Sequence, residues 1–306
     1  MKQSVVIAFV AIGLIASTIA QSRAGDRLKD RLEQRKSEAT ATMSRSAKGA
    51  QRLSYGDDKA QHILFFRADR SHQRPPLAVF IHGGGWKNGA PELVDNKPEW
   101  FARHGWAFAS VGYRLLPDSP VEEQARDIGR ALDKLRSDAV RLGFDANRII
   151  LFGHSAGAHL TALVSTDPSY ALASFSAIRG AILIDGACYD IPSQIAASRF
   201  MARRTYIPAF GTDPARQREL SPVTHAGGRD VPNWLLLYTS ARDDAQAQSK
   251  LLSSALKRGG VQSDLVEIQS KTDKQLTEHR AINVEFGTAG YAGNPAIEAI
   301  MQRVAE

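Results

Sequence analysis

The chain of 306 residues is predicted to form an α/β domain in which a mostly parallel sheet is covered by helices on both faces. Two observations predict this class. Short runs of β-branched and large apolar residues alternate with segments whose apolar side chains repeat at helical spacing. One such run, residues 148–152, leads directly into Gly-x-Ser-x-Gly at Gly153 to Gly157, where a helical pattern begins. In such sheets functional residues lie in loops at the carboxyl ends of the strands.

Apolar runs bounded by turn residues predict the strands, and apolar residues at intervals of three and four predict the helices. Strands are expected at residues 61–66, 77–81, 107–113, 148–152, 181–184, 234–239 and 263–268. Helices are expected at residues 120–139, directly after Gly157, and at 246–258 and 296–304. Residues 188–220 show neither pattern clearly, so we expect a small lid-like insertion over the site.

Composition favours a globular domain and argues against a nucleic-acid partner. Hydrophobic residues make up 43% and charged residues 23% of the chain, as in ordinary soluble proteins. The net charge of +7 is concentrated in residues 1–52, which hold ten basic and four acidic side chains. The remainder is close to neutral. The single cysteine, Cys188, excludes an intrachain disulfide and a thiolate metal cluster, and we expect it to be buried.

The first 24 residues are typical of an export signal. Lys2 precedes an apolar run at residues 5–15, and small residues that suit cleavage follow. The run is too short for a comfortable membrane span. We therefore expect cleavage, a periplasmic or secreted protein, and no stable membrane insertion. An uncleaved N-terminal anchor is the alternative, because one basic residue precedes the run and several follow it.

Ser155 occupies a sharp strand-to-helix turn that suits a catalytic nucleophile. Such a turn strains the serine and lifts its hydroxyl off the sheet. The flanking glycines are required because a Cβ at Gly153 or Gly157 would collide with the neighbouring strand or helix. A serine hydroxyl is a poor nucleophile at neutral pH. It needs a base that takes its proton and a carboxylate that orients the base.

Elimination and topology select His279 as the base. In enzymes with this serine turn the partners follow in the order serine, acid, histidine. Only three histidines follow Ser155. His159 lies one turn further along the helix that starts at the serine, and His225 precedes a strand, where a structural role is expected. His279 follows the last predicted strand, where the base should lie.

The acid is expected in the loop after the strand that ends at Thr239. Asp243 and Asp244 both lie there. The sequence cannot separate them, because a change of one residue in the loop conformation exchanges which side chain faces His279. Glu278 is a weaker candidate, because the side chains of consecutive residues diverge.

Three backbone amides are candidates for an oxyanion hole. Ala156 follows the nucleophile, and Gly83 and Gly84 follow the strand at residues 77–81. A glycine lets its backbone approach a substrate closely. Each such donor contributes about 3 kcal/mol of transition-state stabilisation.

Four motifs together resemble the α/β-hydrolase superfamily. They are His82-Gly83-Gly84-Gly85-Trp86, Tyr113-Arg114-Leu115, Gly153-His154-Ser155-Ala156-Gly157, and the distal aspartates and histidine. The likeness is to the esterase branch that includes hormone-sensitive-lipase-like and arylformamidase-like enzymes, and it extends from about Tyr55 to the C-terminus. It implies a sheet of about eight strands and the roles given above. The sequence departs from the family pattern at Ser240, where a glycine usually opens the turn before the acid.

We therefore expect a serine hydrolase that cleaves small-molecule carboxylic esters through an acyl-enzyme, without a metal or organic cofactor. Residues 1–24 would be the signal, 25–52 a charged linker and 53–306 the catalytic domain. One alternative is an arylformamidase-like amide hydrolase, which shares these motifs. Another is a non-catalytic binding protein of the same fold, although such a protein has no physical need for a strained serine turn.

Overall fold

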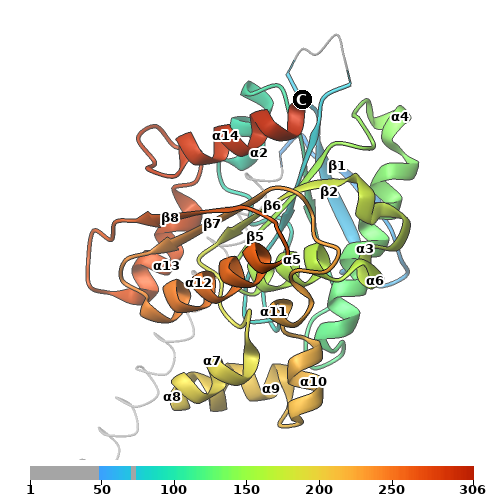
Figure 1. Ribbon diagram of the computed structural model, residues 1–306. Coiled ribbons are helices and arrows are strands. Elements are labelled where there is room, and N and C mark those ends of the chain that lie inside the picture. The colour runs from blue at the N-terminus through green and yellow to red at the C-terminus, as the bar shows by residue number, and fades with distance from the viewer. Residues whose placement is uncertain (1–47, 70–73) are drawn as a thin grey trace, which may run out of the picture. The chain divides into compact units, whose positions relative to one another are not determined.

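Within residues 48–69 and 74–306, which the computed structural model describes, eight strands form one sheet in the order β1-β2-β4-β3-β5-β6-β7-β8 (Figure 1). β2 is antiparallel to β1 and β4, and the other neighbouring strands are parallel. The strands are β1 (Gln51–Ser54), β2 (His62–Phe66), β3 (Leu77–Ile81), β4 (Ala107–Val111), β5 (Ile149–His154), β6 (Ile178–Ile184), β7 (Trp234–Thr239) and β8 (Ser263–Ile268). The predicted α/β class with a mostly parallel sheet is confirmed.

The predicted export signal and residues 25–47 of the predicted linker lie outside the described residues. The chain from Gly49 to Glu306 forms one compact unit. Its first strand begins at Gln51, two residues before the predicted start of the domain. No helix in the described part of the chain has the length and apolar character needed to cross a membrane.

Helices cover both faces of the sheet because successive side chains of each buried strand point to opposite sides. On β3, Leu77, Val79 and Ile81 belong to one apolar core, and Ala78 and Phe80 belong to the other. The first core is completed by α3 (Val121–Ser137), α5 (Ala156–Thr166) and α12 (Asp243–Arg258). The second is completed by α2 (Lys97–Arg103), α13 (Gln275–Val284) and α14 (Asn294–Ala305).

The predicted long helix after residue 120 is present as α3 followed by α4 (Ala139–Leu142). Gly143 ends it with a φ of 82°, a left-handed conformation that glycine adopts without strain. The polypeptide then enters β5. The strand β1 and the helices α2 and α13 were not predicted from the sequence patterns.

The segment between β6 and β7 contains the predicted insertion. It holds no strand and consists of short helices at one end of the sheet (Figure 1). They are α7 (Ile191–Ala197), α8 (Arg199–Met201), a π-helical turn (Ala202–Tyr206), α9 (Ile207–Phe210) and α10 (Pro214–Glu219), followed by α11 (Pro222–His225). Cys188, at the start of the insertion, is buried, as predicted.

The strand-to-helix turn between β5 and α5 has the predicted strain. Ser155 has a φ of 57°, in the left-handed region that non-glycine residues seldom adopt. A Cβ on Gly153 would lie 2.4 Å from the carbonyl oxygen of Gly157, and a Cβ on Gly157 would lie 2.1 Å from that of Ile81. Both collisions expected from the sequence are therefore confirmed. The glycines allow α5 to start directly against β3.

Gly157→Ala should destabilise the fold because its methyl group would meet the backbone of β3. We expect the free energy of unfolding to fall by about 3 kcal/mol or more. Gly105→Ala is the control, since its φ is 75° but no heavy atom lies within 4 Å of the added Cβ. That substitution should cost only about 1 to 2 kcal/mol. Denaturant unfolding measures both losses, and equal losses would contradict the steric argument.

Candidate functional site

Ser155 and His279, which are 124 residues apart in the chain, meet at the carboxyl end of the sheet. Nε2 of His279 lies 3.0 Å from Oγ of Ser155, within hydrogen-bonding distance. Ser155 is held by the turn after β5, and His279 lies in α13, after β8. The structure therefore brings the predicted nucleophile and base into the contact that proton transfer requires.

The carboxylate beside His279 belongs to Asp185, which corrects the prediction of Asp243 or Asp244. Oδ2 of Asp185 lies 2.6 Å from Nδ1 of His279. Strand register explains this position. His154 and Ile184 are partners across β5 and β6, so the residues that follow them, Ser155 and Asp185, leave the sheet together. The two expected aspartates instead form the first turn of α12, after the strand beyond β6.

Asp244 contacts Arg242 and not His279. Nη2 of Arg242 donates to Oδ2 of Asp244 at 2.8 Å, and Nε donates to Oδ1 at 3.2 Å. The same guanidinium donates from Nη1 to Oδ2 of Asp185 at 2.9 Å and to the Asp185 carbonyl oxygen at 2.9 Å. Arg242 therefore links the two carboxylates. Asp243 is exposed and lines the cavity.

Asp185 is fully buried and still ionised. Burial by itself would raise the pKa of its carboxyl, but the hydrogen bond with His279 and the positive charge of Arg242 lower that pKa to about 2. Thr239 also donates its backbone N–H to Oδ1 at 3.1 Å. Because the carboxylate is charged at neutral pH, it can accept a hydrogen bond from the Nδ1–H group of His279. This hydrogen bond fixes the ring tautomer.

His154, the residue before the serine, holds the backbone of α13 in place at His279. Its Nε2 donates to the carbonyl oxygen of His279 at 2.7 Å. Burial and the nearby imidazole of His279 keep the pKa of His154 well below its usual range. No sequence pattern predicts this role of His154, because its partner lies in a helix 125 residues away.

The glycine loop after β3 packs against the serine turn. A Cβ on Gly83 would lie 2.8 Å from the carbonyl oxygen of His154 and 3.1 Å from Cβ of Ser155, so only glycine fits there. Gly84 has a φ of 126°. Gly84 and Ala156 both line the cavity that contains Ser155. Of the three residues predicted for the oxyanion hole, Gly83 thus packs on the serine turn, and Gly84 and Ala156 line the cavity beside Ser155.

Two other histidines near the site are buried and contact neighbouring segments. His82 stacks on Tyr113 with ring centroids 4.3 Å apart. His159 accepts from Nε1 of Trp86 at 3.3 Å and donates from Nε2 to the carbonyl oxygen of Leu220 at 2.9 Å, which ties the glycine loop to the insertion. Burial lowers the pKa of each imidazole to about 4. Both rings are neutral at physiological pH.

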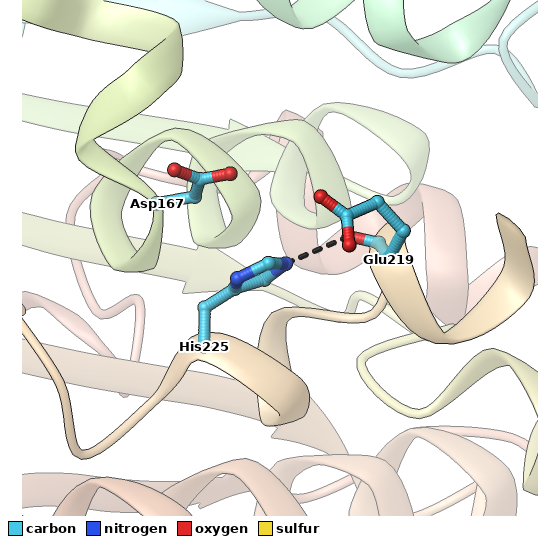
Figure 2. A group of neighbouring side chains, drawn as sticks. All are labelled: Asp167, Glu219 and His225. Atoms are coloured by element: carbon cyan, nitrogen blue, oxygen red, sulfur yellow. Dashed lines mark hydrogen bonds between the residues drawn. The ribbon is translucent and has the colours of Figure 1, made fainter. Parts of the chain in front are cut away.

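His225, the remaining candidate base, lies far from the serine. Its Nε2 donates to the carbonyl oxygen of Glu219 at 2.7 Å, as Figure 2 shows. His225, Glu219 and Asp167 offer potential ligand atoms within 4.8 Å of one another. Asp167 also caps α6 (Pro168–Ala171) through the N–H of Ser169. This group sits at the end of α5 opposite Ser155, about 16 Å along the helix, and is no part of the serine site.

A cavity of about 820 Å³ opens over Ser155. This volume suits a small organic ligand. Its walls come from the glycine loop, the serine turn, the insertion and the first turns of α12 and α13. The lining residues are Gly84, Gly85, Trp86, His154, Ser155, Ala156, Asp185, Ala187, Ala197, Ser198, Met201, Thr205, Tyr206, Arg242, Asp243, Asp244, Ala247, Gln275, Leu276 and His279.

Known proteins share parts of this sequence. Residues 64–187 match the family described as BD-FAE, a span that includes the glycine loop, the serine turn and Asp185. Over 203 residues the chain is 28% identical to esterase LipC of Mycobacterium tuberculosis, covering 62% of this chain and 50% of that protein. Over 139 residues it is 27% identical to kynurenine formamidase of Drosophila melanogaster, covering 45% of each. The chain thus spans half or less of these curated relatives.

Solved structures show the fold. Esterase B from Lactobacillus rhamnosis superposes with a TM-score of 0.70 at 21% identity, covering 90% of this chain and 94% of that one. Esterase 2 of Thermogutta terrifontis with bound propionate superposes with a TM-score of 0.61 at 23% identity, covering 84% and 92%. The chain has the α/β-hydrolase fold, as its motifs predicted.

The buried neutral histidines should make stability depend on pH. Between pH 6.5 and 4, His82 and His159 take up a proton in the unfolded chain but not in the folded one. The unfolded state binds more protons there, so stability should fall as the pH decreases. We expect about 1.4 kcal/mol per pH unit for each imidazole. Urea unfolding at pH 6.5 and 5 measures this slope.

One variant separates the contribution of His159 to the pH dependence of stability from the contributions of other titratable groups. His159→Phe should reduce the slope by the share of one imidazole, even if the variant is less stable at every pH. A slope that is unchanged in this variant would show that His159 is not neutral in the folded protein.

Proposed function

We propose that this protein is a serine hydrolase that cleaves small-molecule carboxylic esters through an acyl-enzyme on Ser155. The observation that carries the proposal is the continuous contact from Ser155 through His279 to Asp185 at the base of the cavity. The likeness to esterases supports it. Export to the periplasm or medium, from the sequence of residues 1–24, remains part of the proposal.

The proposed reaction begins with Oγ of Ser155 attacking the ester carbonyl carbon while Nε2 of His279 takes its proton. Asp185 accepts the Nδ1–H hydrogen bond and stabilises the imidazolium that forms. Negative charge develops on the carbonyl oxygen, which accepts hydrogen bonds from the backbone N–H groups of Ala156, Gly83 and Gly84. His279 then returns the proton to the departing alkoxide. Water repeats the sequence on the acyl-enzyme and releases the acid.

Arg242 and Asp244 act in this proposal as positioning residues for Asp185. A buried carboxylate is costly unless it is paired and hydrogen-bonded. The guanidinium of Arg242 supplies that partner, and its bidentate contact with Asp244 fixes its orientation. Asp244 also balances the positive charge of Arg242.

An arylformamidase-like amide hydrolase is the second candidate function. It uses the same serine chemistry, and the likeness to kynurenine formamidase favours it. The two functions differ in the leaving group, an alcohol or an aryl amine. A substrate panel separates them better than any feature of the site.

Ser155→Ala should abolish both hydrolysis and covalent labelling. A fluorophosphonate probe should label the wild type and leave Ser155→Ala unlabelled, because the probe requires the activated hydroxyl. Short-chain p-nitrophenyl esters assayed beside N-formyl-kynurenine then assign the substrate class. A well-folded wild type that is neither labelled nor active on either substrate would favour a non-catalytic binding protein.

Asp185→Asn should lower kcat by about 10⁴-fold, because an asparagine can hold the wrong tautomer of His279. Asp243→Asn is the matched control, since it makes the same change on an exposed carboxylate of the same cavity, and it should have little effect. Asp244→Asn should have an intermediate effect through Arg242. Steady-state kinetics with a p-nitrophenyl ester measure all three. A larger loss in Asp243→Asn than in Asp185→Asn would restore the acid expected from the sequence.

A further inference from the structure

The insertion has two different faces along residues 197–206. Ala197, Ser198, Met201 and Thr205 line the cavity over Ser155. Ala202 is buried, and the four other intervening positions are exposed and line a separate shallow pocket. These are Arg199, Phe200, Arg203 and Arg204, and we call them the arginine rim.

The arginine rim combines exposed charge with exposed apolar surface. All four side chains are exposed, and the exposed fraction of Phe200 is 70%. Arg204 lies over the Phe200 ring at 5.9 Å. An exposed phenylalanine between arginines is typical of segments that lie at a membrane interface, with the ring in the acyl boundary and the guanidinium groups among the headgroups.

The charge of the rim is uncompensated among the described residues. The sequence from residue 191 to 211 contains three arginines and no acidic residue. None of the three forms an ion pair with a described residue, whereas Arg216, further along the insertion, pairs with Glu122 at 2.6 Å. Three free guanidinium groups complement an anionic surface.

Another exposed apolar side chain lines the cavity over Ser155. Leu276, in the first turn of α13, lines the cavity and is 84% exposed. Among the six exposed large apolar side chains of the described chain, Leu276 has the highest exposed fraction, and Phe200 shares the third highest with Leu172. Phe200 belongs to the insertion and Leu276 to the first turn of α13, so two of these six side chains lie on elements that form the cavity walls.

We propose that the arginine rim docks the protein on an anionic phospholipid surface, with Phe200 inserted at the interface and the cavity mouth close to the membrane. Arg199, Arg203 and Arg204 would contact lipid phosphates. The N-terminal segment of this chain is a poor alternative occupant, because residues 1–52 carry a net positive charge. A free anion would use the arginines but would leave Phe200 exposed to water. Docking does not depend on the proposed ester hydrolysis.

Vesicle co-sedimentation tests the proposal with the full chain. Vesicles of equimolar phosphatidylcholine and phosphatidylglycerol should bind the wild type, and vesicles of phosphatidylcholine alone should bind it much less. Each arginine near such a surface contributes a factor of about five. The triple substitution Arg199→Gln, Arg203→Gln and Arg204→Gln should therefore weaken binding about a hundredfold.

The matched control removes the same charge elsewhere. Arg103, Arg179 and Arg258 are exposed and lie near the amino ends of β4, β6 and β8, at the opposite edge of the sheet. Their substitution by glutamine should weaken binding much less. Equal losses in the two triple variants, or wild-type binding that ignores phosphatidylglycerol, would overturn the proposal. Hydrolysis of a soluble ester should be unchanged in the rim variant, which shows that the site is intact.

Phe200→Trp reports insertion directly. The four natural tryptophans are buried. The new exposed indole should therefore account for most of the change in tryptophan fluorescence on binding. Its emission should shift to shorter wavelength with anionic vesicles and not with inorganic phosphate. A shift with phosphate alone, or no shift with the vesicles, would overturn docking on a membrane.

Discussion

The orientation of the His279 imidazole is set by contacts at both of its ring nitrogen atoms, and the other residues of the site are arranged to make these contacts. Nε2 contacts a hydroxyl, and Nδ1 contacts a carboxylate and the guanidinium of Arg242. The hydroxyl and the carboxylate are brought together by parallel strand register, because Ser155 and Asp185 directly follow a register pair of β5 and β6. His279 then needs only to reach this edge of the sheet. His154 holds its backbone there.

A buried carboxylate imposes the second constraint. Asp185 has no exposed surface, and an ionised group in that position needs compensating charge and hydrogen bonds. Arg242, at the end of β7, supplies both, and Asp244 fixes Arg242. Gln194, in the insertion, donates to Asp244 at 3.1 Å. The electrostatic support of the site therefore extends from the sheet into the segment that covers the cavity.

The insertion lies between the cavity and the outer surface. Its inner side chains shape the cavity, and His159 ties its end to the serine helix through Leu220. Its outer side chains form the arginine rim. The same short helices carry both sets of side chains. A membrane surface that binds the arginine rim would therefore also set the position of the cavity entrance. This geometry connects the proposed docking to access to Ser155 without any change in the contacts of His279.

The sequence by itself determined the α/β class, the strained turn at Ser155 and the glycine loop, because these rest on local periodicity and on backbone conformations that only glycine permits. It also singled out His279, since few histidines follow the serine. It could not identify Asp185, although that residue directly follows a predicted strand. Which strands are neighbours, and in what register, depends on packing between residues far apart in the chain. The same packing placed Arg242 where an acid was expected and turned Arg199, Arg203 and Arg204 outward, so only the tertiary structure decided the acid and the rim.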